Sequence, residues 1–190
     1  RYFAAGMERL IESKTRVEPV SEQLLEVLED DDGKEAVSGL VKQWASLKKL
    51  QTRYDQYREK HGGEKAVDAK NKAQHQLREA FDPFFAALHE GLKLLDKIVR
   101  QHEKQQAEQA QADGKRGATD RKTKALKTAL DTLHKEVKNA EIFYQHIHWL
   151  QERFPKVEYE DVTGLCKLTT SADVAQQDYS LNPGRYVGVV

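Results

Sequence analysis

The sequence has a single cysteine, Cys166, four prolines and no long apolar run in 190 residues. One cysteine excludes an internal disulfide framework and a metal site made of several cysteines from one chain. Because a membrane-spanning helix needs roughly 18 or more consecutive apolar residues, we expect no membrane contact and a cytoplasmic location. Lys+Arg and Asp+Glu are equal at 31 each, so binding to a polyanion requires a local patch of charge rather than an overall field.

The ratio of charged to hydrophobic residues favours long two-faced helices. Charged residues make up 33% of the chain and hydrophobic residues only 38%. A helix that buries one stripe and exposes the rest of its surface has such a composition. We therefore predict a mainly α fold of long antiparallel helices, in a bundle or coiled-coil-like arrangement over residues 1–153. Residues 154–190 are predicted to form a short irregular C-terminal segment.

Apolar positions three and four residues apart predict where the helices begin and end. The pattern gives two short helices, 2–13 and 20–28. A long helix follows, which starts at residue 34 and ends at Gly62, because two consecutive glycines stop a helix. The next helix restarts at Asp82-Pro83, since proline is tolerated in a first helical turn.

The last long helix, residues 118–154, has the most regular pattern. Its apolar residues alternate four and three apart over about three heptads, which indicates coiled-coil-like packing. At ~1.5 Å per residue the helix is on the order of 55 Å long. A helix of this length needs an equally long partner helix, either in this chain or in another. The stripe supplies five partner-binding candidates: Leu126, Leu130, Leu133, Val137 and Tyr144.

No group of residues in the sequence indicates catalysis. Asp82-Pro83-Phe84-Phe85 resembles the acidic loop of amino-methyltransferases only superficially, and its helical setting favours a helix restart. The sequence contains no Gly-x-Gly after a strand, so it offers no cofactor loop. His146 and His148 lie roughly 200° apart on a helix and cannot bind one metal ion together. We therefore assign no catalytic, cofactor-binding or metal-binding residue.

A basic cluster precedes the apolar stripe of the last long helix. It supplies five DNA-phosphate candidates: Lys115, Arg116, Arg121, Lys122 and Lys124. Lys127 extends the cluster, and only Asp120 opposes it. Basic residues at the start of a helix contact nucleic-acid phosphates in many proteins. The alternative is a solvated, lysine-rich helical turn without a ligand.

The pattern becomes shorter in range after residue 154. A strand is predicted at 164–168, followed by a helix of one or two turns with Ser171 as its N-cap. Asn182-Pro183-Gly184 predicts a turn, because proline presets one turn residue and glycine is free to take a positive φ.

Three blocks of this C-terminal part occur in a recognisable order. They are WLQERFP at 149–155, DVTGLCK at 161–167 and DYSLNPGRYVG at 178–188. Together they resemble the C-terminal part of the modification subunit of type I restriction–modification systems. Those subunits are adenine-specific DNA methyltransferases that use S-adenosylmethionine.

The resemblance implies a division of labour between this chain and other parts of an assembly. In the family, an upstream domain holds the cofactor and an Asn-Pro-Pro-Phe loop. Because the chain starts with Arg1 and has neither motif, we expect it to be the C-terminal portion of a longer protein and inactive alone. The resemblance implies as partners the specificity subunit, the other subunits of the complex and, once assembled, DNA. It adds three partner-binding candidates from the terminal block: Asn182, Arg185 and Tyr186.

Two hypotheses remain open from the sequence. The first is an assembly region that docks on a specificity subunit and supports DNA engagement. The second is a free-standing helical coiled-coil scaffold without a methyltransferase role, which self-associates through its long helices. The apolar stripe is compatible with both hypotheses, because its partner helix is not identified by the pattern.

Overall fold

The structure is a computed structural model that describes residues 2–112 and 121–188. The long helices are α1 (Tyr2–Val27), α2 (Asp31–Ala45), α3 (Leu47–His61), α4 (Val67–Glu79), α5 (Asp82–Ala112) and α6 (Arg121–Arg153). The C-terminal part contains α7 (Ser171–Gln176) and a 3-10 helix, η1 (Pro183–Arg185). The described part of the chain has no strand, which confirms the mainly α prediction.

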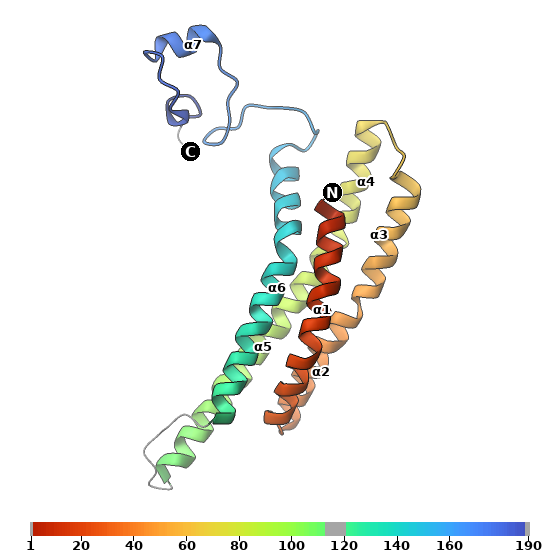
Figure 1. The fold of residues 1–190 in the computed structure, drawn as a ribbon, viewed down its shortest axis with the longest axis vertical. Coiled ribbons are helices and arrows are strands. Elements are labelled where there is room, and N and C mark those ends of the chain that lie inside the picture. Colours follow the sequence, from red (N-terminus) through yellow and green to blue (C-terminus); the bar gives the residue numbers. More distant parts are fainter. Residues whose placement is uncertain (1, 113–120, 189–190) are drawn as a thin grey trace.

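The helices form four antiparallel rods, two of which are interrupted (Figure 1). The chain descends along α1, ascends through α2 and α3, descends through α4 and α5, and returns along α6. α1 packs along α6, α2 packs on α5, and α5 also packs on α6. This up-down-up-down order is the connectivity that short links between neighbouring helices produce. The prediction of long antiparallel helices is therefore confirmed.

Two of the predicted helix boundaries are wrong. α1 is one helix through Pro19 rather than two short ones, because buried residues on both sides of the proline, Val17 and Leu24 among them, hold one face of the helix in the core. The predicted long helix from residue 34 is divided at Ser46, whose Oγ donates to the Gln43 carbonyl at 2.6 Å. The restart at Asp82-Pro83 is confirmed, since Pro83 is the second residue of α5.

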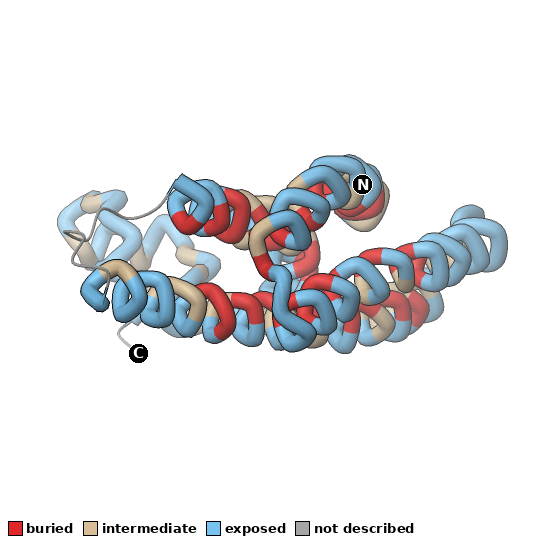
Figure 2. The backbone as a smooth tube through the Cα atoms, turned by 90° about the horizontal axis from the view of Figure 1, so that it is seen from below, coloured by how far each residue is buried: buried red, intermediate tan, exposed pale blue. Residues whose placement is uncertain are grey.

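The core follows the faces that the helices turn toward one another (Figure 2). Its most deeply buried large side chains come from every rod: Leu10, Leu24, Leu40, Phe81, Leu88, Leu92, Leu95, Leu126 and Leu133. An aromatic cluster joins α1, α5 and α6. In this cluster the ring of Tyr144 is stacked on Phe81 with centroids 4.3 Å apart and lies 5.2 Å from Phe85. Burial of these side chains is the main favourable term in the stability of the bundle.

A helix that crosses a membrane is long and apolar over most of its length. Within the described ranges, none of the helices is long and apolar enough to span a membrane.

Candidate partner-binding site

The stripe of α6 lies inside the chain's own core. Its five candidate residues are all buried, with between 0% and 6% of their surface exposed: Leu126, Leu130, Leu133, Val137 and Tyr144. The long partner helix that the stripe requires is α1 of the same chain, with α5 on the other flank. These side chains are therefore core residues in this structure, and no other chain reaches them while the bundle is folded.

The segment that follows α6 differs from the bundle because it has no core. From Phe154 to Gly188 every residue is exposed or half-buried. Figure 1 shows this segment extending away from the end of the bundle. Its conformation is therefore fixed by hydrogen bonds and turns rather than by apolar burial, and its apolar side chains remain in contact with solvent.

Asp161 organises the first loop of the segment. Its Oδ1 accepts a hydrogen bond from the Tyr159 hydroxyl at 2.8 Å and from the Leu168 backbone N–H at 2.9 Å. The Leu168 N–H, and after it the Tyr159 hydroxyl, lowers the pKa of the Asp161 carboxyl below its ordinary value. Reduced hydration of the phenol and this hydrogen bond raise the pKa of Tyr159 to about 12. The ionised carboxylate is thus the state that holds the loop.

The predicted strand at 164–168 is wrong. Only one antiparallel bridge forms, in which the backbones of Val162 and Cys166 exchange hydrogen bonds of 2.9 and 3.0 Å. Gly164 lies between them with φ of 75° and donates its N–H to the Val187 carbonyl at 2.8 Å. That hydrogen bond joins the first loop to the end of the segment.

A capping box begins α7, and its N-cap is Thr170 rather than the predicted Ser171. The Thr170 hydroxyl accepts from the Asp173 N–H at 3.2 Å, and an Asp173 carboxylate oxygen accepts from the Thr170 N–H at 2.8 Å. The Thr170 N–H, and after it the Thr170 hydroxyl, which donates to the same carboxylate oxygen at 2.8 Å, lowers the pKa of Asp173. Two backbone donors that a helix start leaves open are satisfied in this way.

The terminal block forms the turn that the sequence predicts. The Asn182 side chain accepts from the Gly184 N–H at 3.1 Å and caps η1. Tyr186 donates its hydroxyl to the Ser180 carbonyl, and Arg185 donates to the Gln177 carbonyl at 3.3 Å. Asn182 and Arg185 are exposed and Tyr186 is half-buried. The side chains of these three candidates therefore stabilise the conformation of the segment. We call this hydrogen-bonded segment, residues 154–188, the C-terminal frame.

Among the residues that the structure describes, the most exposed large apolar side chains lie in this segment. Leu181 is 80% exposed, and Leu168 and Tyr179 are each 76% exposed. Asp178 and Tyr179 adopt positive φ angles of 53° and 57°, a conformation that is costly for residues other than glycine. Strongly exposed apolar side chains mark a surface that another protein covers where they gather in one patch, so these three residues are candidates for contact with a partner. Sequence reasoning missed these residues, because single apolar residues in loops have no periodic signal.

A cavity of about 410 Å³ lies at the root of the segment, at the end of the bundle. Its apolar lining comes from α1, α6 and the first residues of the segment: Phe3, Ile147, Leu150, Phe154 and Val157. Oε1 of Gln151 also borders the cavity and has no hydrogen-bond partner. Asn71 of α4 fixes the adjacent backbone by donating to the Pro155 carbonyl at 2.6 Å. The exposed apolar surface of the segment thus begins at the bundle itself.

The predicted basic cluster is divided between different sides of α6. Lys115 and Arg116 lie outside the described residues. Arg121 and Lys124 border a depression that α6 shares with α1, whereas Lys122 lies beside the acidic turn between α1 and α2. The described part of the cluster therefore does not form one continuous phosphate-binding face.

The remaining candidates for chemistry have structural roles. Phe84 and Phe85 of the Asp82-Pro83 restart are buried in the core. His148 Nδ1 accepts a hydrogen bond from the Arg78 guanidinium at 2.8 Å, while His146 lies against the ring of Tyr2. In the parts of the chain that the structure covers, no three ligand side chains are grouped to hold a metal ion.

Comparison of the chain with protein-family models, with curated proteins and with solved structures gave no match. The resemblance to type I modification subunits therefore depends on the three sequence blocks alone. The structure adds the location of these blocks: the first covers the end of α6, and the other two build the C-terminal frame.

Proposed function

We propose that this chain is the C-terminal assembly region of a type I restriction–modification N6-adenine DNA methyltransferase. In this role the helical bundle supports the C-terminal segment, and the segment packs on the specificity subunit. DNA is engaged in the assembled complex. The observation that carries the proposal is the exposure of Leu168, Tyr179 and Leu181 on a hydrogen-bonded frame that has no core of its own.

The position of the sequence blocks supports the same assignment. The block at 178–188 contains Tyr179 and Leu181 together with the capping Asn182, so the residues that carry the resemblance also carry the exposed surface. S-adenosylmethionine belongs to the upstream domain in this proposal. The chain has no Gly-x-Gly loop, and we assign none of its residues to that cofactor.

The alternative is a free-standing coiled-coil scaffold, and it relied on pairing of the α6 stripe between chains. Because that stripe is buried by α1 and α5 of the same chain, it supports neither pairing between chains nor docking of α6 on a specificity subunit, and the assembly proposal depends on the C-terminal segment instead. Self-association through the C-terminal segment is a different arrangement, and the experiment below detects it.

Co-purification tests the proposal. The chain is expressed with a specificity subunit from the same genome, and a shorter chain that ends at Val157 is the comparison. The bundle helices α1 to α6 are intact in the shorter chain, so circular dichroism per helical residue and the unfolding midpoint should remain close to those of the whole chain. We expect the whole chain to retain the specificity subunit and the shorter chain to lose it.

Two results would contradict this assignment. One is equal retention of the specificity subunit by both chains. The other is a stable homodimer of the whole chain in light scattering, with no affinity for the specificity subunit, which would favour a self-associating scaffold. The proposal also expects no methyl transfer by the chain alone, and adenine methylation once the upstream domain and the specificity subunit are supplied.

A further inference from the structure

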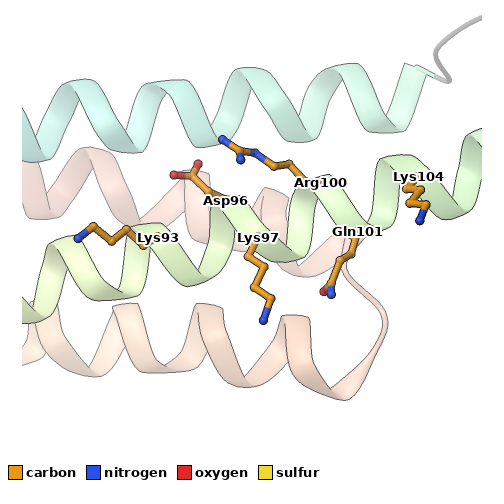
Figure 3. A pocket seen from close by; sticks show the side chains of 6 residues that line it. All are labelled: Lys93, Asp96, Lys97, Arg100, Gln101 and Lys104. Carbon is orange, nitrogen blue, oxygen red and sulfur yellow. The ribbon is translucent and has the colours of Figure 1, made fainter.

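Four cations form a stripe along the outer face of α5, apart from the basic cluster of α6. The stripe, called here the α5 cation stripe, consists of Lys93, Lys97, Arg100 and Lys104. All four are exposed and follow the spacing i, i+4, i+7 and i+11, which keeps them on one side of the helix. At ~1.5 Å per residue the stripe is about 17 Å long. With Asp96 and Gln101 it lines a depression of about 420 Å³ (Figure 3).

The two carboxylates that lie between the cations of the stripe in the sequence are engaged by α6. Glu103 forms an ion pair with Lys127 of α6, and Asp96 Oδ1 lies 3.0 Å from Nε2 of His134. Figure 3 shows Asp96 and the side chain of Arg100 extending to the same side of α5, while Lys97 extends to the other.

The cations of the stripe therefore keep an excess of positive charge. Among the described residues, no carboxylate comes within 4.0 Å of the charged groups of Lys93, Lys97 or Arg100. Lys104 is 3.9 Å from Glu108, and both side chains are mostly exposed, so that pair is weak. In a chain with no net charge, such an excess marks a specific patch.

α5 presents the stripe rigidly. Residues between the cations, Leu95, Ile98 and Val99, are buried against the other helices and fix the orientation of this face. A fixed row of cations loses little conformational freedom of the backbone when it meets a partner. The row therefore favours a partner that is itself stiff and regularly charged.

The exposed residues between the cations indicate which polyanion the stripe suits: a single-stranded nucleic acid, a membrane surface or a nucleic-acid duplex. None of them is a phenylalanine, tyrosine or tryptophan, although single-stranded nucleic acids are bound mainly by stacking on such side chains. Leu94, 48% exposed, is the one exposed apolar residue between Lys93 and Lys104, whereas a helix that lies on a membrane needs a broad apolar face. The phosphate backbone of a duplex requires neither feature.

We propose that the α5 cation stripe contacts the phosphate backbone of double-stranded DNA without reading its sequence. The phosphate contact rests on the stripe itself, and the choice of DNA rests on the proposed function. Lysine and arginine heads on one helix face neutralise phosphates and release the counterions that condense on a duplex. The stripe thus adds to affinity and leaves base recognition to another subunit.

Fluorescence anisotropy with a labelled DNA duplex of random sequence tests the proposal across a series of salt concentrations. The test variant replaces the whole stripe: Lys93→Gln, Lys97→Gln, Arg100→Gln and Lys104→Gln. The control variant makes the same change of charge and residue type on exposed positions of α3: Lys48→Gln, Lys49→Gln, Arg53→Gln and Lys60→Gln. Circular dichroism and the unfolding midpoint confirm that both variants fold like the unmodified chain.

We expect the unmodified chain and the α3 variant to bind the duplex with the same dependence on salt. The stripe variant should bind more weakly, and its slope of log affinity against log salt should be smaller by about 3.6, at ~0.9 for each phosphate that a cation of the stripe neutralises. The single variants Lys97→Gln and Arg100→Gln should each reduce the slope by about 0.9.

Three results would overturn the proposal. The first is an unchanged slope in the stripe variant, and the second is an equal reduction in the α3 variant. The third is a preference of the unmodified chain for duplex RNA, for single strands or for vesicles of anionic lipid over duplex DNA. The anisotropy assay contains no specificity subunit, and the co-purification assay contains no DNA, so failure of this inference is distinguishable from failure of the assembly proposal.

Discussion

Gly6 of α1 and Tyr144 of α6 pack against each other where the two helices meet. A Cβ atom on Gly6 would lie 2.9 Å from Cζ of Tyr144 and 3.0 Å from its hydroxyl oxygen. Both residues are buried, and the tyrosine ring is stacked on Phe81. The close approach of α1 to α6 therefore requires glycine at position 6.

The variant Gly6→Ala should be destabilised by about 1–3 kcal/mol, because overpacking displaces the tyrosine ring or separates the two helices. The control is Gly39→Ala in α2, where a Cβ atom meets nothing within 4 Å. This second variant should be stabilised by roughly 0.5–1 kcal/mol, since alanine is the better helix former. Urea denaturation measures both, and equal stabilities of the two variants would contradict the packing of α1 on α6.

The buried stripe of α6 gives a second prediction. Leu133→Ala should lower the free energy of unfolding by about 2–5 kcal/mol, because Leu133 is fully buried and its truncation leaves a cavity. Ile142→Ala on the same helix should change it by less than about 0.5 kcal/mol, as Ile142 is 43% exposed. Thermal unfolding of the two variants makes the comparison. A decrease below about 0.5 kcal/mol for Leu133→Ala would return the stripe to the partner-binding candidates.

Tyr144 carries a buried hydroxyl for which the structure shows no hydrogen-bond partner. Removal of an unsatisfied hydroxyl leaves no polar group behind, so Tyr144→Phe should be as stable as the unmodified chain at pH 7, or more stable. Burial also raises the pKa of Tyr144. The burial of the neutral phenol therefore leaves stability independent of pH below the unfolded pKa of 10.0, and the folded chain loses stability as the pH rises above that value.

The free energy of unfolding, measured from pH 9 to 11, tests whether stability falls as the pH rises. The unmodified chain should lose more stability over this range than Tyr144→Phe, and Tyr2→Phe, which removes an exposed tyrosine, is the control. A steeper loss in Tyr144→Phe than in the unmodified chain would show that the phenol is not buried in its neutral form.

The lowered pKa of Asp161 predicts how the loop responds to acidic pH. Its pKa is lowered from 3.8 mainly by the Leu168 N–H, so the loop keeps its stability above that value and loses it as the pH falls through the lower folded pKa. In NMR spectra, the Leu168 amide shift should titrate with a midpoint below 3.8. The same titration step should disappear in Asp161→Asn. A midpoint at or above 3.8 in the unmodified chain would contradict the hydrogen bond.

The helices could be predicted wherever one face repeats regularly. The restart at Pro83 and the stripe that includes Leu133 follow from local rules of proline placement and apolar spacing. The continuous α1 could not be predicted, because the burial of Val17 and Leu24 overrides the break that Pro19 favours. The helix that covers the α6 stripe is determined by tertiary packing, so no local sequence pattern identifies it.

The candidate surfaces could be predicted less well from the sequence than the helices. The α5 cation stripe does not stand out in the sequence, because core residues such as Leu95 and Val99, together with two acidic residues, separate its cations. Only the packing of α5 shows that Glu103 is already paired with Lys127. In the C-terminal segment, the turn at Asn182 follows from residue types, whereas the positive φ of Tyr179 does not, because tyrosine rarely adopts this conformation.

In the proposed function, the C-terminal segment binds the specificity subunit through its exposed apolar side chains. The most direct test is the dissociation constant for the specificity subunit, measured by calorimetry with the variant Leu168→Ser, Tyr179→Ser, Leu181→Ser. The matched control removes three exposed apolar residues of the bundle: Leu25→Ser, Val41→Ser and Ile142→Ser. We expect the first variant to bind at least about 10-fold more weakly, as for residues at the centre of an interface, and the control to bind like the unmodified chain. Equal affinities of the unmodified chain and the C-terminal variant would contradict the claim.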